Sequence, residues 1–237
     1  MKFNTPLQQA RLIKRYKRFL VDIELPNQQH TTIHCANTGA MTGCADEGFT
    51  AFYSTSDNPK RKYPHSLELT QNQHDHLICV NTALANKIVY EAIAEQHVAE
   101  LTGYQNIQAE VKYGQENSRI DILLSNEDGT LCYVEIKSVT LLADNGQGFF
   151  PDAVSARGLK HLRELIEMKK QGHRAVLFFL VQHQGITHLS PAAHIDPKYN
   201  EGIKQALAAG VEILCYNTHI SSDAIRLNKT LSFNVID

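Results

Sequence analysis

The chain has 237 residues, of which 43% are hydrophobic and 20% are charged, and its formal net charge is −2. This is ordinary globular composition, with enough length for one large domain or two small ones. No apolar run approaches the roughly 18 residues of a membrane span, and residues 1–19 lack a signal-peptide apolar region, so we expect a soluble, cytoplasmic protein with no membrane contact.

The start of the chain is locally basic. Residues 1–20 contain no acidic residue and carry Lys2, Arg11, Lys14, Arg15, Lys17 and Arg18, and NPKRK at 58–62 adds Lys60, Arg61 and Lys62. On a slightly acidic chain, such segments suggest a polyanion contact confined to one face. The alternative is a solvated basic surface helix and a loop. For nucleic-acid binding we select Arg15, Arg18, Lys60, Arg61 and Lys62.

Residues 1–80 predict a small β domain. Partly alternating β-branched and aromatic residues, separated by turn residues, predict short strands at 16–25, 30–36, 49–56, 65–70 and 76–81. About five short strands favour a small antiparallel barrel or sandwich, one form of which is the OB barrel. Such barrels often hold single-stranded nucleic acid, and Tyr63 beside the basic loop could stack on a base or simply be half-buried.

From residue 81 to 237 the pattern changes to a second, α/β domain. We predict a helix at 82–101, strands at 107–113, 119–124 and 131–138, a helix at 155–172, a strand at 174–182, a helix at 199–210 and a strand at 211–216. The last two strands each follow a helix, which implies parallel crossovers within a mixed central sheet covered on both faces. The whole chain is therefore predicted to be α/β, or α+β overall.

Asp121, Glu135 and Lys137 are charged residues in strands otherwise built to be buried. Because side chains alternate along a strand, Glu135 and Lys137 share one face, and the turn at 126–130 places Asp121 on the neighbouring strand. Buried charges cost several kcal/mol unless they are paired or bind a cation. Two carboxylates beside a lysine suit Mg²⁺ or Mn²⁺, with Asp121 and Glu135 as ligands.

The expected chemistry is phosphodiester hydrolysis. The cation would polarise the phosphodiester, and Lys137 would orient water or neutralise charge developing on the phosphate. The alternative is a charged cluster at a sheet edge that discourages aggregation. A Glu-x-Lys spacing by itself should arise about once by chance in a chain of this length.

Two helices could extend this site. Glu91 falls on the same helical stripe as Leu84 and Ile88, so it could reach the metal site, and Glu95 is the rival candidate. On the later helix, Arg157, Lys160, His161 and Glu164 lie opposite Leu162 and Ile166 and could face phosphate. The alternative for that surface is a plain solvated helix face.

The cysteines and histidines do not predict a metal centre. The five cysteines are odd in number, scattered and free of CxxC spacing, so we expect them to be reduced. The pair in HDH at 74–76 has no third ligand nearby and is read as part of a polar loop.

RID at 119–121 followed by VEIK at 134–137 resembles the PD-(D/E)xK restriction-endonuclease-like superfamily, with Ile120-Asp121 in place of Pro-Asp. More specifically, nearly the full chain resembles the sugar fermentation stimulation protein A family. The stretches that carry this resemblance are NTGAMTG (37–43), SDNPKRKYP (56–64), ENSRIDILL (116–124), VEIKSVTL (134–141), FFPDAVSARGLKHLREL (149–165) and GHRAVLFFLVQ (172–182).

The resemblance implies an N-terminal OB-like domain over 1–80, a nuclease-like domain over 81–237, non-specific DNA binding and a regulatory part in maltose and other sugar metabolism. It carries over Asp121, Glu135, Lys137 and, less directly, Glu91. We keep three hypotheses: a Mg²⁺- or Mn²⁺-dependent nuclease, a DNA-binding regulator that uses the nuclease fold as a scaffold, and a partner protein of sugar metabolism. All of them leave open a homo-oligomer.

Overall fold

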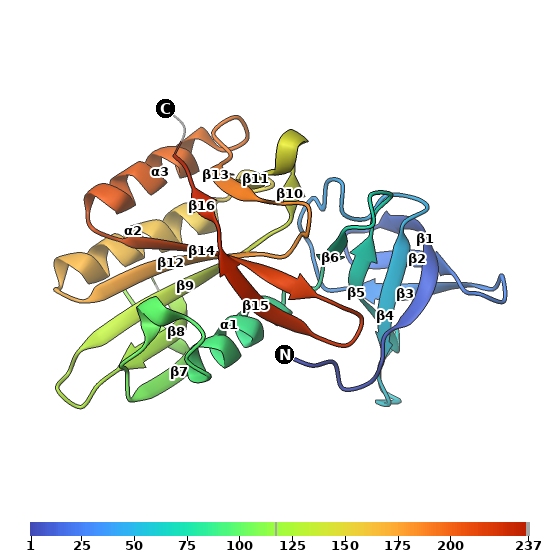
Figure 1. Ribbon diagram of the computed structural model, residues 1–237, viewed down its shortest axis with the longest axis horizontal. Coiled ribbons are helices and arrows are strands. Elements are labelled where there is room, and N and C mark those ends of the chain that lie inside the picture. The colour runs from blue at the N-terminus through green and yellow to red at the C-terminus, as the bar shows by residue number, and fades with distance from the viewer. Residues whose placement is uncertain (117, 236–237) are drawn as a thin grey trace.

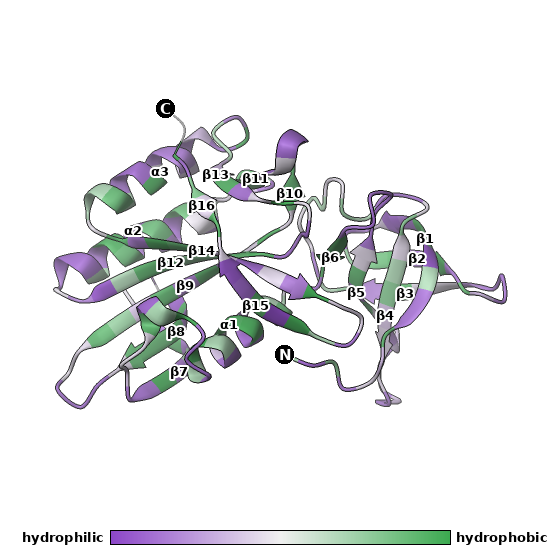
Figure 2. Ribbon diagram, in the orientation of Figure 1, coloured by the Kyte–Doolittle hydropathy of each residue, from purple (hydrophilic) through white to green (hydrophobic). Residues whose placement is uncertain are grey.

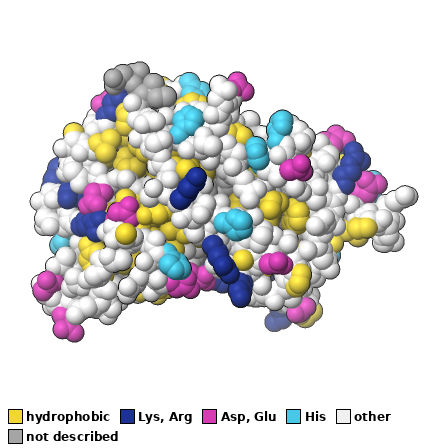
Figure 3. Space-filling model, viewed as in Figure 1, with side chains coloured by type: hydrophobic (Ala, Val, Ile, Leu, Met, Phe, Trp, Pro, Cys, Tyr) yellow, Lys and Arg dark blue, Asp and Glu magenta, His cyan; other side chains and the backbone are white. Residues whose placement is uncertain are grey.

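A computed structural model describes residues 1–116 and 118–235. It contains a small β-barrel next to a larger α/β domain (Figure 1). Among the described residues, no helix is long and apolar enough to cross a membrane. Charged side chains of both signs are interspersed on the face shown in Figure 3.

The barrel is a closed sheet of five strands with one short strand added. Strand order is β3-β2-β1-β4-β5-β6, and a parallel pairing of β3 with β5 closes the ring. The order of pairing around the ring is that of an OB fold, so the prediction of an OB-like barrel is confirmed. Its strands are β1 (Gln8–Tyr16), β2 (Leu20–Glu24), β3 (His30–Cys35), β4 (Thr50–Thr55), β5 (His65–Gln71) and β6 (Leu77–Cys79).

The single strand predicted at 16–25 is wrong in one respect. It covers β2 and the end of β1, while most of β1 lies in the basic segment that was also considered as a surface helix. Ala10 and Leu12 point into the barrel core and alternate with exposed polar residues, which is strand periodicity. The cations of β1 obscured that alternation.

The second domain is built on a mixed sheet, as predicted. It has six strands in the order β15-β14-β12-β9-β8-β7, and β15 was not predicted. β12 runs parallel to both β9 and β14, and the other neighbours are antiparallel. The strands are β7 (Asn106–Tyr113), β8 (Ser118–Ser125), β9 (Leu131–Val139), β12 (Arg174–Val181), β14 (Glu212–Ile220) and β15 (Ile225–Thr230). The centre of this sheet is strongly hydrophobic (Figure 2).

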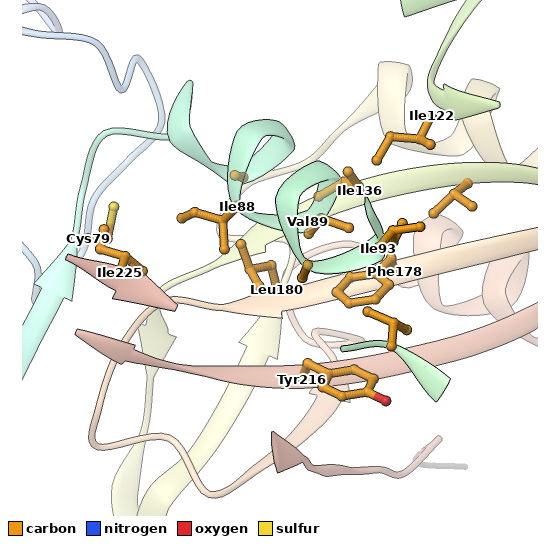
Figure 4. Packing of buried hydrophobic residues seen from close by; sticks show 14 of the residues in the cluster. Cys79, Ile88, Val89, Ile93, Ile122, Ile136, Phe178, Leu180, Tyr216 and Ile225 are labelled. Carbon is orange, nitrogen blue, oxygen red and sulfur yellow. The ribbon is translucent and has the colours of Figure 1, made fainter. Parts of the chain in front are cut away.

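Helices cover both faces of this sheet. α1 (Leu84–Ala94) lies on one face, where Ile88, Val89 and Ile93 pack against Phe178 and Leu180 (Figure 4). A single 3₁₀ turn (Ala99–Leu101) follows it. α2 (Ala156–Lys170) and α3 (Pro197–Ala208) lie on the other face, and each begins at a side-chain cap, Ser155 and Asp196 respectively.

A second, smaller sheet was not predicted. It has the order β10-β11-β13-β16, formed by β10 (Leu141–Leu142), β11 (Gln147–Phe150), β13 (His188–Pro191) and β16 (Ser232–Phe233), with a 3₁₀ turn at Asp144–Gly146. These strands have two to four residues. Segments this short are below the length at which alternation gives a signal.

One hydrophobic cluster extends from the α/β domain to the barrel. The cluster beneath α1 also contains Leu7, Phe52, Leu69 and Cys79, which belong to the barrel or its borders. The first residues of the chain cross over to the α/β domain, where Lys2 bridges to Ala224 beside β15. The N-terminal residues of the chain therefore contact the second domain, although they lie before the predicted domain boundary at residue 80.

Candidate functional site

Asp121 lies where β8 and β9 part. The two strands pair as far as Ile122 and Val134, and one step further the Asp121 carboxylate replaces the backbone ladder. Its Oδ2 accepts a hydrogen bond of 2.7 Å from the backbone N–H of Ile136, the residue directly after Glu135. The register thus brings the Asp121 carboxylate against the backbone that carries Glu135.

Glu135 and Lys137 project together from β9, as strand alternation predicts. Lys137 Nζ lies 2.7 Å from Oε1 of Glu135, and Nδ1 of His161 on α2 contacts the same oxygen. Nδ1 of His161 is also 3.1 Å from Lys137 Nζ. Glu135 is 2% exposed, so these contacts form in a setting that water barely reaches.

The second carboxylate oxygen of Glu135 is the atom of this site that could bind a ligand. Oε2 is buried and has no hydrogen-bond partner among the residues that the structure describes. A buried carboxylate oxygen without a donor is costly unless a cation or water completes it. Within the described chain, no three His, Cys, Asp or Glu side chains are arranged to hold a metal ion. A cation at Asp121 and Glu135 would therefore depend on water and substrate for its other ligands, as Mg²⁺ commonly does.

The two carboxyl groups have opposite pKa shifts. Burial, followed by the negative charge of Glu135, raises the pKa of Asp121 to about 6. Burial also acts to raise the pKa of Glu135, but the hydrogen bond to His161 and the charge of Lys137 outweigh it and hold that pKa below its usual value. Glu135 is thus ionised, whereas Asp121 titrates close to neutral pH. Separated pKa values in one acidic pair are typical of functional sites.

The structure does not bring Glu91 to this site, which corrects the expectation from the helical stripe. Glu91 Oε2 lies 2.8 Å from the amino group of Met1, because its stripe of α1 faces the N-terminal segment and β15. Glu95, the rival candidate, contacts His97 near the helix end. Neither residue meets Asp121.

Asn86 is the α1 residue that reaches Asp121. Its Nδ2 donates to Asp121 Oδ1 at 2.8 Å and to Glu110 Oε1 at 3.2 Å. Glu110 adopts a left-handed backbone with φ of 56°, which turns it out of the regular pattern of β7. The sequence carried one signal for Asn86, since it lies on the same helical stripe as the buried Val89 and Ile93. Nothing in the sequence singled out Glu110.

The predicted polar face of α2 is in fact divided between the interior and the surface. His161 and Glu164 are buried on the side of α2 that packs towards the sheet, so a solvated face is wrong for both. Glu164 accepts the backbone N–H groups of Gln115 and Glu116 at 3.1 and 2.6 Å. It therefore holds the turn between β7 and β8 against α2.

Of the two predicted phosphate-facing cations on α2, Arg157 is exposed and Lys160 is half-buried. Arg157 is exposed, and its Nε lies 3.4 Å from Nε2 of His161, which links the surface to Glu135. Lys160 donates to the carbonyl oxygen of Glu116.

Arg15 has a structural setting that the sequence did not reveal. Its guanidinium donates to the carbonyl oxygens of Arg18, Asn37, Gly39 and Ala40, so it binds the loop at 37–40. The expectation that Arg15 contacts nucleic acid is therefore not supported. Arg18, Lys60, Arg61 and Lys62 are exposed, and Lys62 lies over the ring of Tyr63.

Comparisons with known proteins agree with this architecture. Residues 83–224 match the family model described as the sugar fermentation stimulation protein RE domain, and residues 13–80 match the SfsA N-terminal OB domain. A sugar fermentation stimulation protein homolog of Pseudoalteromonas translucida is 60% identical, over 98% of this chain and all of its own length. A homolog of Aliivibrio fischeri is 56% identical over 99% of this chain and all of its own.

The fold also matches a solved structure over almost its whole length. The structure of Pyrococcus furiosus SfsA in complex with Ca²⁺ superimposes with a TM-score of 0.87 at 26% identity, covering 99% of this chain and 98% of that one. With an OB barrel joined to an α/β domain that matches the RE domain of the family model, and with relatives of this identity along its full length, the chain belongs to the sugar fermentation stimulation protein A family.

Proposed function

We propose that this protein is a Mg²⁺- or Mn²⁺-dependent nuclease that hydrolyses phosphodiester bonds in DNA at Asp121, Glu135 and Lys137. One observation carries the proposal: a buried, ionised glutamate keeps one oxygen unpaired next to a second carboxylate and an ammonium group. A divalent cation bound there would polarise the phosphodiester and make an attacking water more acidic.

The residues of the chain prepare this site in distinct ways. Lys137 is a fixed positive charge where negative charge develops on the phosphate during attack. His161 holds Oε1 of Glu135 and so leaves Oε2 for a ligand. The amide of Ile136 and the side chain of Asn86 fix both oxygens of Asp121. These hydrogen bonds hold the two carboxylates in the orientation in which they could bind a cation.

DNA as the substrate is supported by two surface features of the chain. The OB barrel is a fold that holds nucleic acid in many proteins, and its exposed loop carries Lys60, Arg61 and Lys62 beside Tyr63. Arg157 offers a further surface cation one helical turn from His161. The structure of the Pyrococcus relative is a complex with Ca²⁺, a divalent cation that prefers oxygen ligands.

The test is cleavage of plasmid, duplex and single-stranded DNA with Mn²⁺ or Mg²⁺. We expect cleavage that EDTA abolishes and that falls about 100-fold or more in Asp121→Asn and Glu135→Gln. Glu91→Gln is the matched control, because Glu91 lies outside the site, and it should cleave like the wild type. Cleavage that persists unchanged in both site variants would refute the proposal.

A second candidate is a DNA-binding regulator of sugar metabolism that uses the nuclease fold without cleavage. The observation that favours it is the pairing of Glu135 with Lys137 and His161, which already balances much of its charge without a cation. DNA binding that survives both carboxylate changes, in a protein that cleaves none of the three substrates, would favour this candidate. Replacing Lys60, Arg61 and Lys62 with Gln should then weaken binding and flatten its salt dependence.

A further inference from the structure

Two cations lie side by side near the end of the β7–β8 hairpin. Lys112 on β7 and Arg119 on β8 are direct cross-strand partners, and both are exposed. They alternate along their strands with Val111, Tyr113 and Ile120, which pack in the core beneath α2. Because side chains alternate between the faces of a sheet, Lys112 and Arg119 project together on the face away from that core.

Neither cation is neutralised by a carboxylate. Within the described residues, the Lys112 side chain forms no hydrogen bond or ion pair, and Arg119 donates only to the backbone carbonyl oxygen of Glu110, at 3.3 Å. Like charges directly opposite each other on paired strands are destabilising. A place where the chain keeps two such charges together without a counter-ion of its own is suited to an anionic ligand.

The carboxylates on and against this hairpin are occupied by other donors. Glu110 Oε1 accepts a hydrogen bond from Asn86, and Glu116 pairs with Arg163 at 2.9 Å. Glu164 accepts two backbone N–H groups of the turn that follows β7. Moving any of these carboxylates to the two cations would break the contacts that it makes. The positive charge of the pair therefore remains for a ligand.

The two cations line a hollow whose size suits a phosphate group. Its volume is about 220 Å³, and Tyr113, Gly114 and Ser118 complete its lining, so none of these described residues brings a negative charge. Sites for drug-sized ligands are larger, at about 300–1,000 Å³. A guanidinium binds phosphate through two parallel N–H groups, and an ammonium binds it as a point charge.

The hollow is close to the acidic site along β8. Asp121 follows Arg119 by two residues, which span about 7 Å on an extended strand. Each strand of duplex DNA carries one phosphate per about 3.4 Å of helix axis. The hollow is therefore on the order of two nucleotides from a phosphate held at Asp121, in the direction of the end of the hairpin.

We propose that Lys112 and Arg119 bind a backbone phosphate of the DNA substrate, next to the phosphate held at the acidic site. This inference rests on the proposed function, from which it takes DNA as the ligand. It adds the β7–β8 hairpin to the DNA-binding surface. A contact of this kind is independent of base sequence and is weakened by salt.

The test is binding of labelled duplex and single-stranded DNA to the full-length protein in EDTA, measured by fluorescence anisotropy at several salt concentrations. We expect the double variant Lys112→Gln with Arg119→Gln to bind about 10-fold or more weakly than the wild type, with a salt slope smaller by about one to two. Its unfolding midpoint should stay equal or rise, because the change removes a like-charge pair. Lys112→Arg keeps the charge and should bind like the wild type.

The matched control is the double variant Lys198→Gln with Lys229→Gln. It removes the same net charge from two exposed positions, of which Lys198 is on α3 and Lys229 is on β15, the edge of the sheet opposite β7. The control should bind DNA like the wild type. An equal loss of affinity in the control would show that only total charge matters, and would overturn the inference.

Free phosphate is another source of the same group, and a calorimetric titration with inorganic phosphate separates the two. If the Lys112 and Arg119 double variant lost binding of inorganic phosphate but kept wild-type DNA affinity, the hollow would hold a free anion and the DNA contact would be refuted.

Failure of the inference is distinguishable from failure of the proposed function. Wild-type DNA affinity in the hairpin variant, with metal-dependent cleavage intact, would overturn the inference alone. Absence of cleavage by the wild type, with DNA binding that still depends on Lys112 and Arg119, would overturn the nuclease and support the contact. Absence of DNA binding by the wild type would overturn both.

Discussion

Lys137 Nζ lies 2.7 Å from Oε1 of Glu135, its neighbour on the same face of β9, and both side chains are almost fully enclosed. A buried pair of this kind stabilises little by itself, but removing one partner leaves an uncompensated charge. The pair is also the contact through which the ammonium group is held beside the acidic oxygens.

Replacing Lys137 should therefore affect both stability and cleavage. Lys137→Gln leaves Glu135 with His161 alone, so we expect unfolding to become easier by about 3 kcal/mol and cleavage to fall about 100-fold. Urea unfolding and single-turnover cleavage with Mn²⁺ would measure these effects. A variant with wild-type cleavage would show that the ammonium takes no part in the chemistry.

Asp121 predicts a pH dependence of stability below neutrality. The pKa of Asp121 is about 6 in the folded state against an ordinary value of 3.8, so the folded state binds more protons between these values. The unfolding free energy in EDTA should therefore include a contribution that is lost as pH rises from about 4 to 6, on the order of 3 kcal/mol. Asp121→Asn should remove that slope. A wild-type slope retained in the variant would contradict the assignment.

His183 predicts a change of stability with pH in the opposite direction. Burial, followed by the nearby His76, lowers the pKa of His183 from 6.5 to about 4, so the unfolded state binds more protons in that window. Stability should fall as pH drops from about 6.5 to 4, by on the order of 3 kcal/mol. His183→Gln should weaken this dependence, whereas the exposed His219→Gln should retain it. Unfolding midpoints across this pH range would test the prediction.

Gly114 should be sensitive to a methyl group for two reasons. Its φ is +69°, and a Cβ there would overlap the Glu164 carboxylate, so we expect Gly114→Ala to destabilise the protein by about 3 kcal/mol. Gly129 has a φ of +86°, but apart from its own chain neighbours no atom of the described residues lies within 4 Å of the position that a methyl group would take there. Gly129→Ala should therefore cost about 1 kcal/mol. Equal effects in urea unfolding would mean that the contact with Glu164 contributes nothing.

Arg15 should behave as a structural residue. Arg15→Lys loses the planar fork that binds the loop at 37–40, and we expect a loss of about 1–2 kcal/mol of stability. Arg18→Lys, at an exposed neighbouring position, should leave stability unchanged. DNA binding by folded Arg15→Lys should match the wild type, which a filter-binding titration would measure.

The sequence by itself determined the parts of this protein that depend on local pattern. Alternation over 131–138 and the turn at 126–130 were sufficient to place Asp121, Glu135 and Lys137 on adjacent strands, because strand periodicity and hairpin register are short-range properties. Most strands of the barrel, apart from β1, and the helix–strand order of the second domain up to β14 were also predicted. The smaller sheet, with strands of two to four residues, was not.

Tertiary structure decided which other side chains meet the acidic pair. Helical periodicity gave the spacing of Asn86 and Glu91 around α1, but only the packing of that helix against the sheet and β15 turned Asn86 towards Asp121 and Glu91 towards Met1. His161 reaches Glu135 from a distant part of the chain for the same reason. Contacts of this kind depend on the angles and distances between packed elements, which a single sequence pattern does not encode.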